Sequence, residues 1–384
     1  MVLPALLSCL VALSPVGAEP AVEATTPSHH LEGVPLINYS SDTGLGLGLY
    51  GAVERFAASH TPYQLRLEVQ AYASTGGTQF HFAQVDLPQV GGSAWRIDAL
   101  AGYRSNSSQP WFGLGNHAPP DATRPDSFYR YNLVEPVLRL RARRKVLGPL
   151  SVVASYRLFL TSVQAAPGSL LAREAPLGMQ GGRFGELAVG LVFDTRDQET
   201  SPNNGVVLEA SGRTAQAFLG SQYATAGVFA AASGYREVVR GLVVAGRLAF
   251  DDQWGAVPFD RLGDLGTTTR PAFLVDGIGG QFSVRGLYEA EYVGPTKALA
   301  NLELRERFLE CVLFQQALAL TAVGFVDAGR VWSPGDPTSL PAAGLHAGVG
   351  GGLRVAWGEF FIVRADVGYA EGRARIYADF GQVF

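Results

Sequence analysis

The chain lacks the long apolar run that a membrane-spanning helix needs. Its residues are 47% hydrophobic and only 17% charged. Even so, no uninterrupted apolar segment after residue 18 approaches the ~18 to 20 residues that cross a bilayer as a helix. A helical membrane protein is therefore excluded. Backbone groups in lipid must be hydrogen-bonded within the protein, so the spanning architecture that remains is a closed β-barrel.

Cysteine is also scarce, because Cys9 and Cys311 are the two cysteines of the chain. Residues 1–18 are apolar and end in the small residues of Val16–Ala18, which predicts a secretory signal peptide over residues 1–18. No Lys or Arg precedes its apolar part, which leaves an upstream start codon open. Removal of this segment would leave a single thiol, so no internal disulfide is expected.

Several functional signatures are missing. The net charge is −4 and basic residues form no stripe, so nucleic-acid binding is not expected. No G-x-S-x-G elbow is present, and we expect no enzyme activity. The histidines share no metal-ligand spacing, so neither a metal nor another cofactor is expected. They are His29, His30, His60, His81, His117 and His346.

What the chain does contain is alternation. Its 47 glycines and 22 prolines suit many turns, and between them apolar and polar residues change places in the period-two pattern of strands. Leu138 and Leu140 alternate with arginines, as do Leu302 and Leu304 with charged residues. This predicts a set of charges facing the lumen: Arg139, Arg141, Arg143, Arg305 and Arg307.

The pattern predicts an all-β fold, a transmembrane antiparallel up-and-down barrel over residues 34–384 preceded by a short periplasmic lead-in over residues 19–33. Fifteen strands can be placed, and sixteen follow if Val34–Ser40 is a separate first strand. Because single-chain bacterial barrels have an even number of strands, we expect sixteen. The literal G-x-G-x-x-G match at Gly46–Gly51 lies in an alternating segment, which favours close strand packing over dinucleotide binding.

The chain stops on an aromatic residue. In Arg375–Phe384 polar and apolar side chains alternate, with Ile376, Ala378, Phe380 and Phe384 on one face. Gln382 interrupts that face. We predict that Phe384 ends the closing strand on its lipid-facing side and acts as the closing-strand signal.

Three motifs follow one another in the last third of the chain. They are Gly279-Gly-Gln-Phe-Ser-Val-Arg-Gly-Leu-Tyr288, Asn301-Leu-Glu-Leu-Arg305 and Gly324-Phe-Val-Asp-Ala-Gly-Arg-Val-Trp332. Two more, Asp194-Thr-Arg-Asp197 with Pro202-Asn-Asn-Gly205 and Gly350-Gly-Gly-Leu-Arg354, accompany them. In this order, and with a terminal Phe, the chain resembles the BamA/TamA family of outer-membrane barrels, the bacterial surface antigen family.

The resemblance implies that a long loop folds into the lumen. Its tip would be Val284, Arg285, Gly286 and Tyr288, with Leu287 standing where the family usually has its aromatic residue. The inner-wall partners of the tip would be Glu303, Phe325, Asp327 and Gly329. Independently of the family, an arginine drawn into a confined lumen loses hydration and needs carboxylates of matched geometry.

The resemblance also implies a function at the bacterial outer membrane, the insertion or translocation of polypeptides. The expected partners are outer-membrane lipid, unfolded outer-membrane or secreted polypeptides and a separate periplasmic protein. That last partner would supply what POTRA domains supply in the family, since residues 19–33 are too few for one. The alternative is a passive pore whose arginine-lined lumen favours anions.

Overall fold

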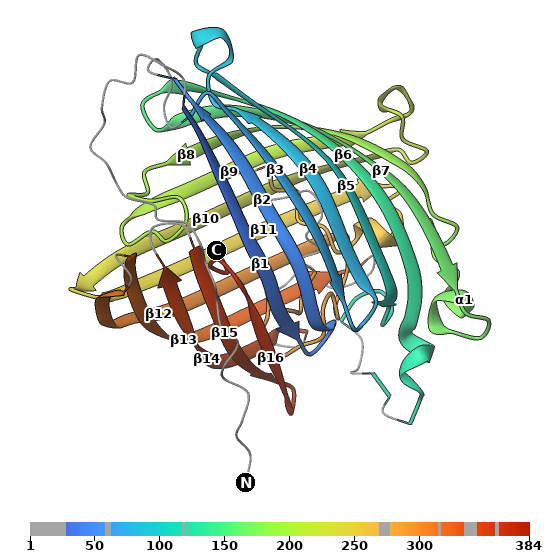
Figure 1. Ribbon diagram of the computed structural model, residues 1–384. Coiled ribbons are helices and arrows are strands. Elements are labelled where there is room, and N and C mark those ends of the chain that lie inside the picture. The colour runs from blue at the N-terminus through green and yellow to red at the C-terminus, as the bar shows by residue number, and fades with distance from the viewer. Residues whose placement is uncertain are drawn as a thin grey trace.

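A computed structural model describes residues 28–57, 63–116, 120–121, 123–268, 277–313, 316–333, 344–357 and 361–384. The expected signal peptide, His60 and His117 lie outside these ranges. Within them, sixteen antiparallel strands close into a barrel, in which each strand pairs with its neighbours in sequence and β1 meets β16 (Figure 1). The expected fold class and strand number are confirmed.

The barrel strands have the following bounds: β1 Ser28–Ser40, β2 Gly44–Phe56, β3 Leu65–Ser74, β4 Thr78–Leu87, β5 Trp95–Pro110, β6 Arg130–Leu147, β7 Leu150–Ala165, β8 Gly182–Asp194, β9 Gly205–Ala215, β10 Thr225–Val239, β11 Leu242–Gly255, β12 Thr296–Leu313, β13 Gln316–Trp332, β14 His346–Trp357, β15 Phe361–Ala370 and β16 Arg373–Phe380. One short helix, α1 (Leu170–Glu174), lies between β7 and β8. In the described ranges no helix is long and apolar enough to cross a membrane.

The first strand begins earlier than the sequence suggested. β1 starts at Ser28 and pairs with β2 along all of its length. Residues 28–33, expected in the lead-in, therefore belong to the barrel. The polar residues at the start of β1 resemble a solvent-exposed segment in sequence, whereas the inward-facing ones line a charged lumen.

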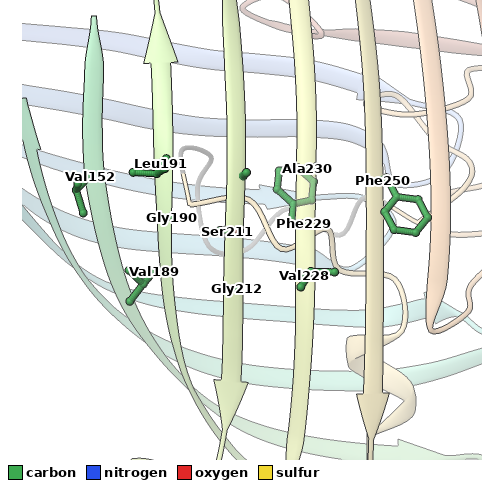
Figure 2. A pocket seen from close by; sticks show the side chains of 11 residues that line it. Val152, Val189, Gly190, Leu191, Ser211, Gly212, Val228, Phe229, Ala230 and Phe250 are labelled. Atoms are coloured by element: carbon green, nitrogen blue, oxygen red, sulfur yellow. The ribbon is translucent and has the colours of Figure 1, made fainter. Parts of the chain in front are cut away.

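The expected alternation is present along the wall. Leu138 and Leu140 are half exposed on the outer face, whereas Arg139 between them is buried. On the outer surface of β7 to β11, small residues leave a shallow apolar groove of about 560 Å³. Figure 2 shows the larger side chains that border it, among them Val152, Leu191 and Phe250.

The G-x-G-x-x-G match lies within β2, as expected. A side chain at Gly46 would collide with the Tyr72 hydroxyl, which donates a 2.7 Å hydrogen bond to Asn38 Oδ1. Gly46 therefore allows β1 and β3 to be linked across the inner face of β2.

The connections between strands differ at the two ends of the barrel. The connection from β11 to β12 covers residues 256–295 and is the longest. The turns at the opposite end, such as residues 148–149 between β6 and β7, are short. Outer-membrane barrels have long extracellular loops and short periplasmic turns. The long connection therefore leaves the barrel at its extracellular end, and the opposite ends of β1 and β16 are periplasmic.

The barrel closes weakly between its first and last strands. β1 and β16 are described throughout, and they pair at two positions, Tyr39 with Ala378 and Ser40 with Tyr377. Ser41, just after β1, adds a 3.0 Å backbone bond to the carbonyl of Ile376. Among the described residues, the β16-facing edge of residues 28–38 therefore has no ladder partner. In Figure 1 the two strands meet near the end of the β1 arrow.

Candidate functional site

The inner wall of β12 and β13 carries buried charges. Glu303 and Asp327 are fully buried, whereas Leu302, Leu304 and Val326 beside them are half exposed on the outer face. Successive side chains of a strand point to opposite faces, so the two carboxylates point into the barrel. Hydrophobic residues facing lipid thereby fix which charges face inward.

Residues 277–295 of the long connection return along this wall, and we call them the inner loop. Ile278 and Tyr292 form an antiparallel bridge with backbone hydrogen bonds of 2.9 and 3.0 Å. The bridge holds the descending and returning arms of the loop side by side. Ile278, Val284 and Leu287 are fully buried in one apolar cluster with residues of the wall. Burial of these side chains favours the docked position of the inner loop.

Arg285 lies at the tip of the inner loop and is fully buried. Its Nε and Nη2 donate to the two oxygens of Asp327 at 2.7 and 2.9 Å, and its Nη1 donates to Glu303 Oε1 at 2.7 Å. Its backbone N–H donates to the same Asp327 at 3.2 Å. The guanidinium also covers the Phe325 ring, 3.4 Å from the ring centroid. The two-bond fork and the stacking are geometries that suit arginine and not lysine.

The surroundings of Arg285 keep its guanidinium protonated. Burial alone would lower the pKa of its guanidinium, but the hydrogen bonds to Asp327 and the charges of Asp327, Glu303 and Asp366 outweigh burial, so the pKa is raised. Arg285 therefore remains a cation in the docked loop. Removing it would leave buried carboxylates without their partner, which is the costly way to break a buried ion pair.

The cluster around Arg285 extends further than the sequence motifs indicated. Asp366 of β15 lies 3.4 Å from Arg285 Nη1. Asn301 donates 2.7 Å bonds to Asp327 and to the carbonyl of Ser283 in the inner loop. Four arginines share the three carboxylates of this cluster: Arg285, Arg305, Arg354 and Arg364 with Glu303, Asp327 and Asp366.

Two glycines allow the tip to approach the wall. Gly286 has φ +105, and a side chain on it would collide with the backbone of Ala370. A side chain on Gly329 would collide with Ile278 of the inner loop. Gly286 is required because its backbone lies directly against the backbone of the wall, and Gly329 leaves room for the Ile278 side chain.

Leu287 occupies the position where the family usually has its aromatic residue, and the aromatic Tyr288 follows it. Leu287 is fully buried in the apolar cluster. The Tyr288 ring lies 5.2 Å from that of Phe112 and is covered by Arg375 of β16 at 4.2 Å. The aromatic residue at the later position thus reaches the closing strand instead of the buried cluster.

The inner loop also touches both sides of the weak seam. Tyr377 of β16 donates to the Leu287 carbonyl and accepts from the Gly286 N–H, both at 3.2 Å. The Glu289 N–H donates at 3.2 Å to Asp42 in the turn after β1. Arg375 of β16 pairs with the same Asp42. Loop docking and seam closure therefore share hydrogen bonds.

The predicted lumen arginines face inward, but several have carboxylate partners. Arg139 and Arg141 donate to Asp98 at 2.8 and 2.6 Å. Arg305 donates to Glu303 at 2.9 Å. These pairs cancel much of the positive potential that an anion-favouring lumen would need.

The remaining two lumen arginines lie in mixed surroundings. Arg307 is near the periplasmic end of β12, 2.9 Å from Glu310 and 3.7 Å from Glu237. Arg143 lines an interior cavity of about 340 Å³ together with Asp194 and Glu199. Neither position forms part of a ring of one charge sign.

Phe384 does not lie on the lipid-facing side of the closing strand, and that prediction is wrong. β16 ends at Phe380, and Gly381, with φ +76, turns the chain inward. The Phe384 ring lies 5.2 Å from the Arg247 guanidinium and 5.4 Å from that of Arg305, which also donates to its carbonyl at 3.3 Å. These cation–π contacts hold the Phe384 ring inside the lumen. The alternation of polar and apolar residues gave no indication of the turn at Gly381.

A closed sixteen-strand barrel with an apolar outer face and a charged interior is an outer-membrane barrel. Residues 185–384, just over half of the chain, match the Omp85 superfamily domain, and the chain belongs to this superfamily. It is therefore an outer-membrane protein of the Omp85 type, a class that inserts or transports proteins. The expected family resemblance and location are confirmed.

Solved structures of the same fold are distant in sequence. BamA from Haemophilus ducreyi lacking POTRA domains 1–3 aligns with a TM-score of 0.60 at 15% identity, over 93% of this chain and 70% of that one. CdiB from Escherichia coli aligns with a TM-score of 0.60 at 13% identity, over 95% of this chain. The chain spans 64% of the length of that CdiB. No curated protein matches the sequence.

Proposed function

We propose that this barrel assists the insertion or translocation of polypeptides at the outer membrane, with the β1–β16 seam as the place where an incoming strand pairs. The observation that carries the proposal is the short seam ladder of two residue pairs. A strand edge with unpaired N–H and C=O groups is a template for β-augmentation. The free edge of residues 28–38 offers such a template.

Arg285 has a supporting role in this proposal. It fixes the tip of the inner loop to β12 and β13, while Gly286 and Leu287 bind Tyr377 of β16. The inner loop thus supports the closing strand from inside while the β1 edge stays available. Unfolded outer-membrane or secreted polypeptides are the proposed substrates, with a separate periplasmic partner delivering them.

The test is folding of an unfolded outer-membrane protein into liposomes that contain this barrel, followed by its gain of protease resistance. The decisive variant carries cysteines at Tyr39 and Ala378, facing positions of the seam, in a Cys311→Ser background. A disulfide here prevents β1 and β16 from separating beside the free edge. If a strand can pair with that edge only when the two strands separate, oxidation should abolish acceleration and reduction should restore it. The matched control places cysteines at Val349 and Tyr369, which pair within the continuous β14–β15 ladder.

Acceleration that persists with the oxidised seam would reject the seam as the entry site. No acceleration by the correctly folded native barrel would reject the insertion function itself. A stable conductance with anion preference in the same liposomes would then favour the passive pore. The pairing of Arg139 and Arg141 with Asp98 argues against that outcome.

A further inference from the structure

Three side chains with metal-ligating atoms meet at the periplasmic end of β1 and β2. His30 and Glu32 lie two residues apart on β1, and Glu54 faces His30 across the ladder. His30 Nδ1 is 3.5 Å from Glu32 Oε1 and 3.8 Å from Glu54 Oε2. One ligand atom from each residue lies within 4.8 Å of the others. Bonds of about 2.0 to 2.2 Å from one ion to imidazole and carboxylate ligands suit such spacing.

The far oxygens of both carboxylates face Arg66 of β3. Its Nη1 binds Glu54 Oε1 at 2.7 Å, and its Nη2 lies 3.8 Å from Glu32 Oε2. Glu54 Oε2 and Glu32 Oε1, the oxygens that face His30, are therefore not engaged by Arg66. In metal sites, residues outside the first coordination sphere commonly orient the ligands by binding their other atoms, as Arg66 does here.

The charge balance also favours a cation. Arg66 contacts a third carboxylate, Glu68, through a 3.1 Å bond from its Nε. With neutral His30, the three carboxylates and one guanidinium carry a net charge of −2. A divalent ion would neutralise this group, and water can reach it because the His30 and Glu32 side chains are each 34% exposed.

We propose that His30, Glu32 and Glu54 form a binding site for a divalent transition metal ion, with water in the open position. One imidazole and two carboxylates are ligands that zinc(II) accepts. The ion would join β1 to β2 along the part of β1 that has no partner on β16. The site thus stiffens the free edge of the barrel, and it stands independently of the function proposed above.

The experiment measures zinc(II) binding to the full chain, folded in detergent and stripped with a chelator, by isothermal titration calorimetry. We expect one zinc ion per barrel, and at least tenfold weaker binding in His30→Ala and in Glu54→Gln. His29→Ala is the matched control, because His29 neighbours His30 but is exposed on the outer face. It should bind as the native chain does.

Cobalt(II) absorption gives a second readout. The expected spectrum lacks a thiolate charge-transfer band, since Cys311 is remote from the cluster in the ladder. Each variant is first checked for the folded barrel by its heat-modifiable gel mobility, and Glu32→Gln replaces Glu54→Gln if the latter does not fold. Absence of zinc binding, or equal binding by His30→Ala, would overturn the site and leave the three residues as an ion-pair cluster.

Discussion

Arg285 and Asp327 are joined by two parallel hydrogen bonds of 2.7 and 2.9 Å at a fully buried position, 42 residues apart in the chain. One residue belongs to the inner loop and the other to the barrel wall. The pair is therefore one of the contacts that fix the inner loop to the barrel wall. It adds to the burial of Ile278, Val284 and Leu287 in holding the loop against the wall.

Replacing Arg285 with alanine should loosen the inner loop. The change leaves Asp327 and Glu303 buried without their shared cation, which costs about 3 to 5 kcal/mol for a buried pair. Residues 277–295 should become susceptible to limited proteolysis in the folded barrel. Arg236→Ala, at an exposed arginine, is the control and should leave the loop protected. Equal protection in both variants would contradict the docking role.

The pairing itself is measured by a double-mutant cycle on Arg285→Ala and Asp327→Ala. Because the two residues bind each other directly, the effect of the double variant on unfolding free energy should fall short of the sum of the single effects. A coupling of about 0.5 to 3 kcal/mol is expected for groups in contact. Additive effects would show that the loop is held by the apolar cluster alone.

Docking of the inner loop should depend on pH through Glu289. Burial and the Asp42 charge raise the pKa of Glu289 to about 7 from its ordinary 4.5, against the opposing charges of Arg104, Arg130 and Arg375. The docked loop therefore takes up a proton that the free loop has released. This contribution to docking is complete below about pH 4.5 and is lost as the pH rises through about 7.

Glu289→Gln keeps the side chain neutral at every pH and should remove this dependence. The measurement compares the unfolding temperatures of the native chain and the variant between pH 5 and pH 8. The native chain should lose stability relative to the variant as the pH rises. Parallel curves would mean that Glu289 does not titrate in this window.

The position of Phe384 can be tested against lipid directly. Phe384→Trp should show little quenching by brominated lipids beyond that of the native tryptophans, since the ring lies among Arg247 and Arg305 inside the barrel. Phe308→Trp, at a half-exposed outward position, is the control and should be quenched strongly. Comparable quenching at both positions would place the C-terminal ring in lipid.

Ion selectivity reports on the paired lumen arginines. Asp98→Asn removes the carboxylate that binds both Arg139 and Arg141, so any residual conductance should shift towards anions. The reversal potential across a planar bilayer in a salt gradient measures the shift. An unchanged potential would indicate that ions do not pass along this part of the wall.

The direction in which many charged side chains point could be predicted from the alternation of polar and apolar residues along a strand. The period of two is set locally by the pleat, and it identified Glu303 and the arginines of β6 and β12 as inward-facing. The same reasoning failed at Ser28–Gly33, where polar residues that face the lumen resembled a solvated lead-in. It failed again at Phe384, because one glycine turn after β16 reverses the direction of the chain.

The family resemblance implied Glu303 and Asp327 as partners of Arg285, and the structure brings these residues together. It did not indicate Asp366, Arg354 and Arg364, which join the cluster from β14 and β15. Their inward positions follow from alternation, but their contact with the loop tip depends on where the loop descends.

The sequence by itself determined that the protein lies in a lipid bilayer and that its fold is a β-barrel. Alternation, turn residues and the lack of a long apolar run are local properties, and a bilayer leaves a closed barrel as the way to satisfy its backbone. Tertiary structure alone decided the two-pair seam, the inward turn of the C-terminus and the meeting of His30 with Glu54. The seam depends on how the first and last strands meet when the barrel closes. The meeting of His30 with Glu54 depends on the register of β1 and β2. The inward turn depends on the backbone conformation of Gly381.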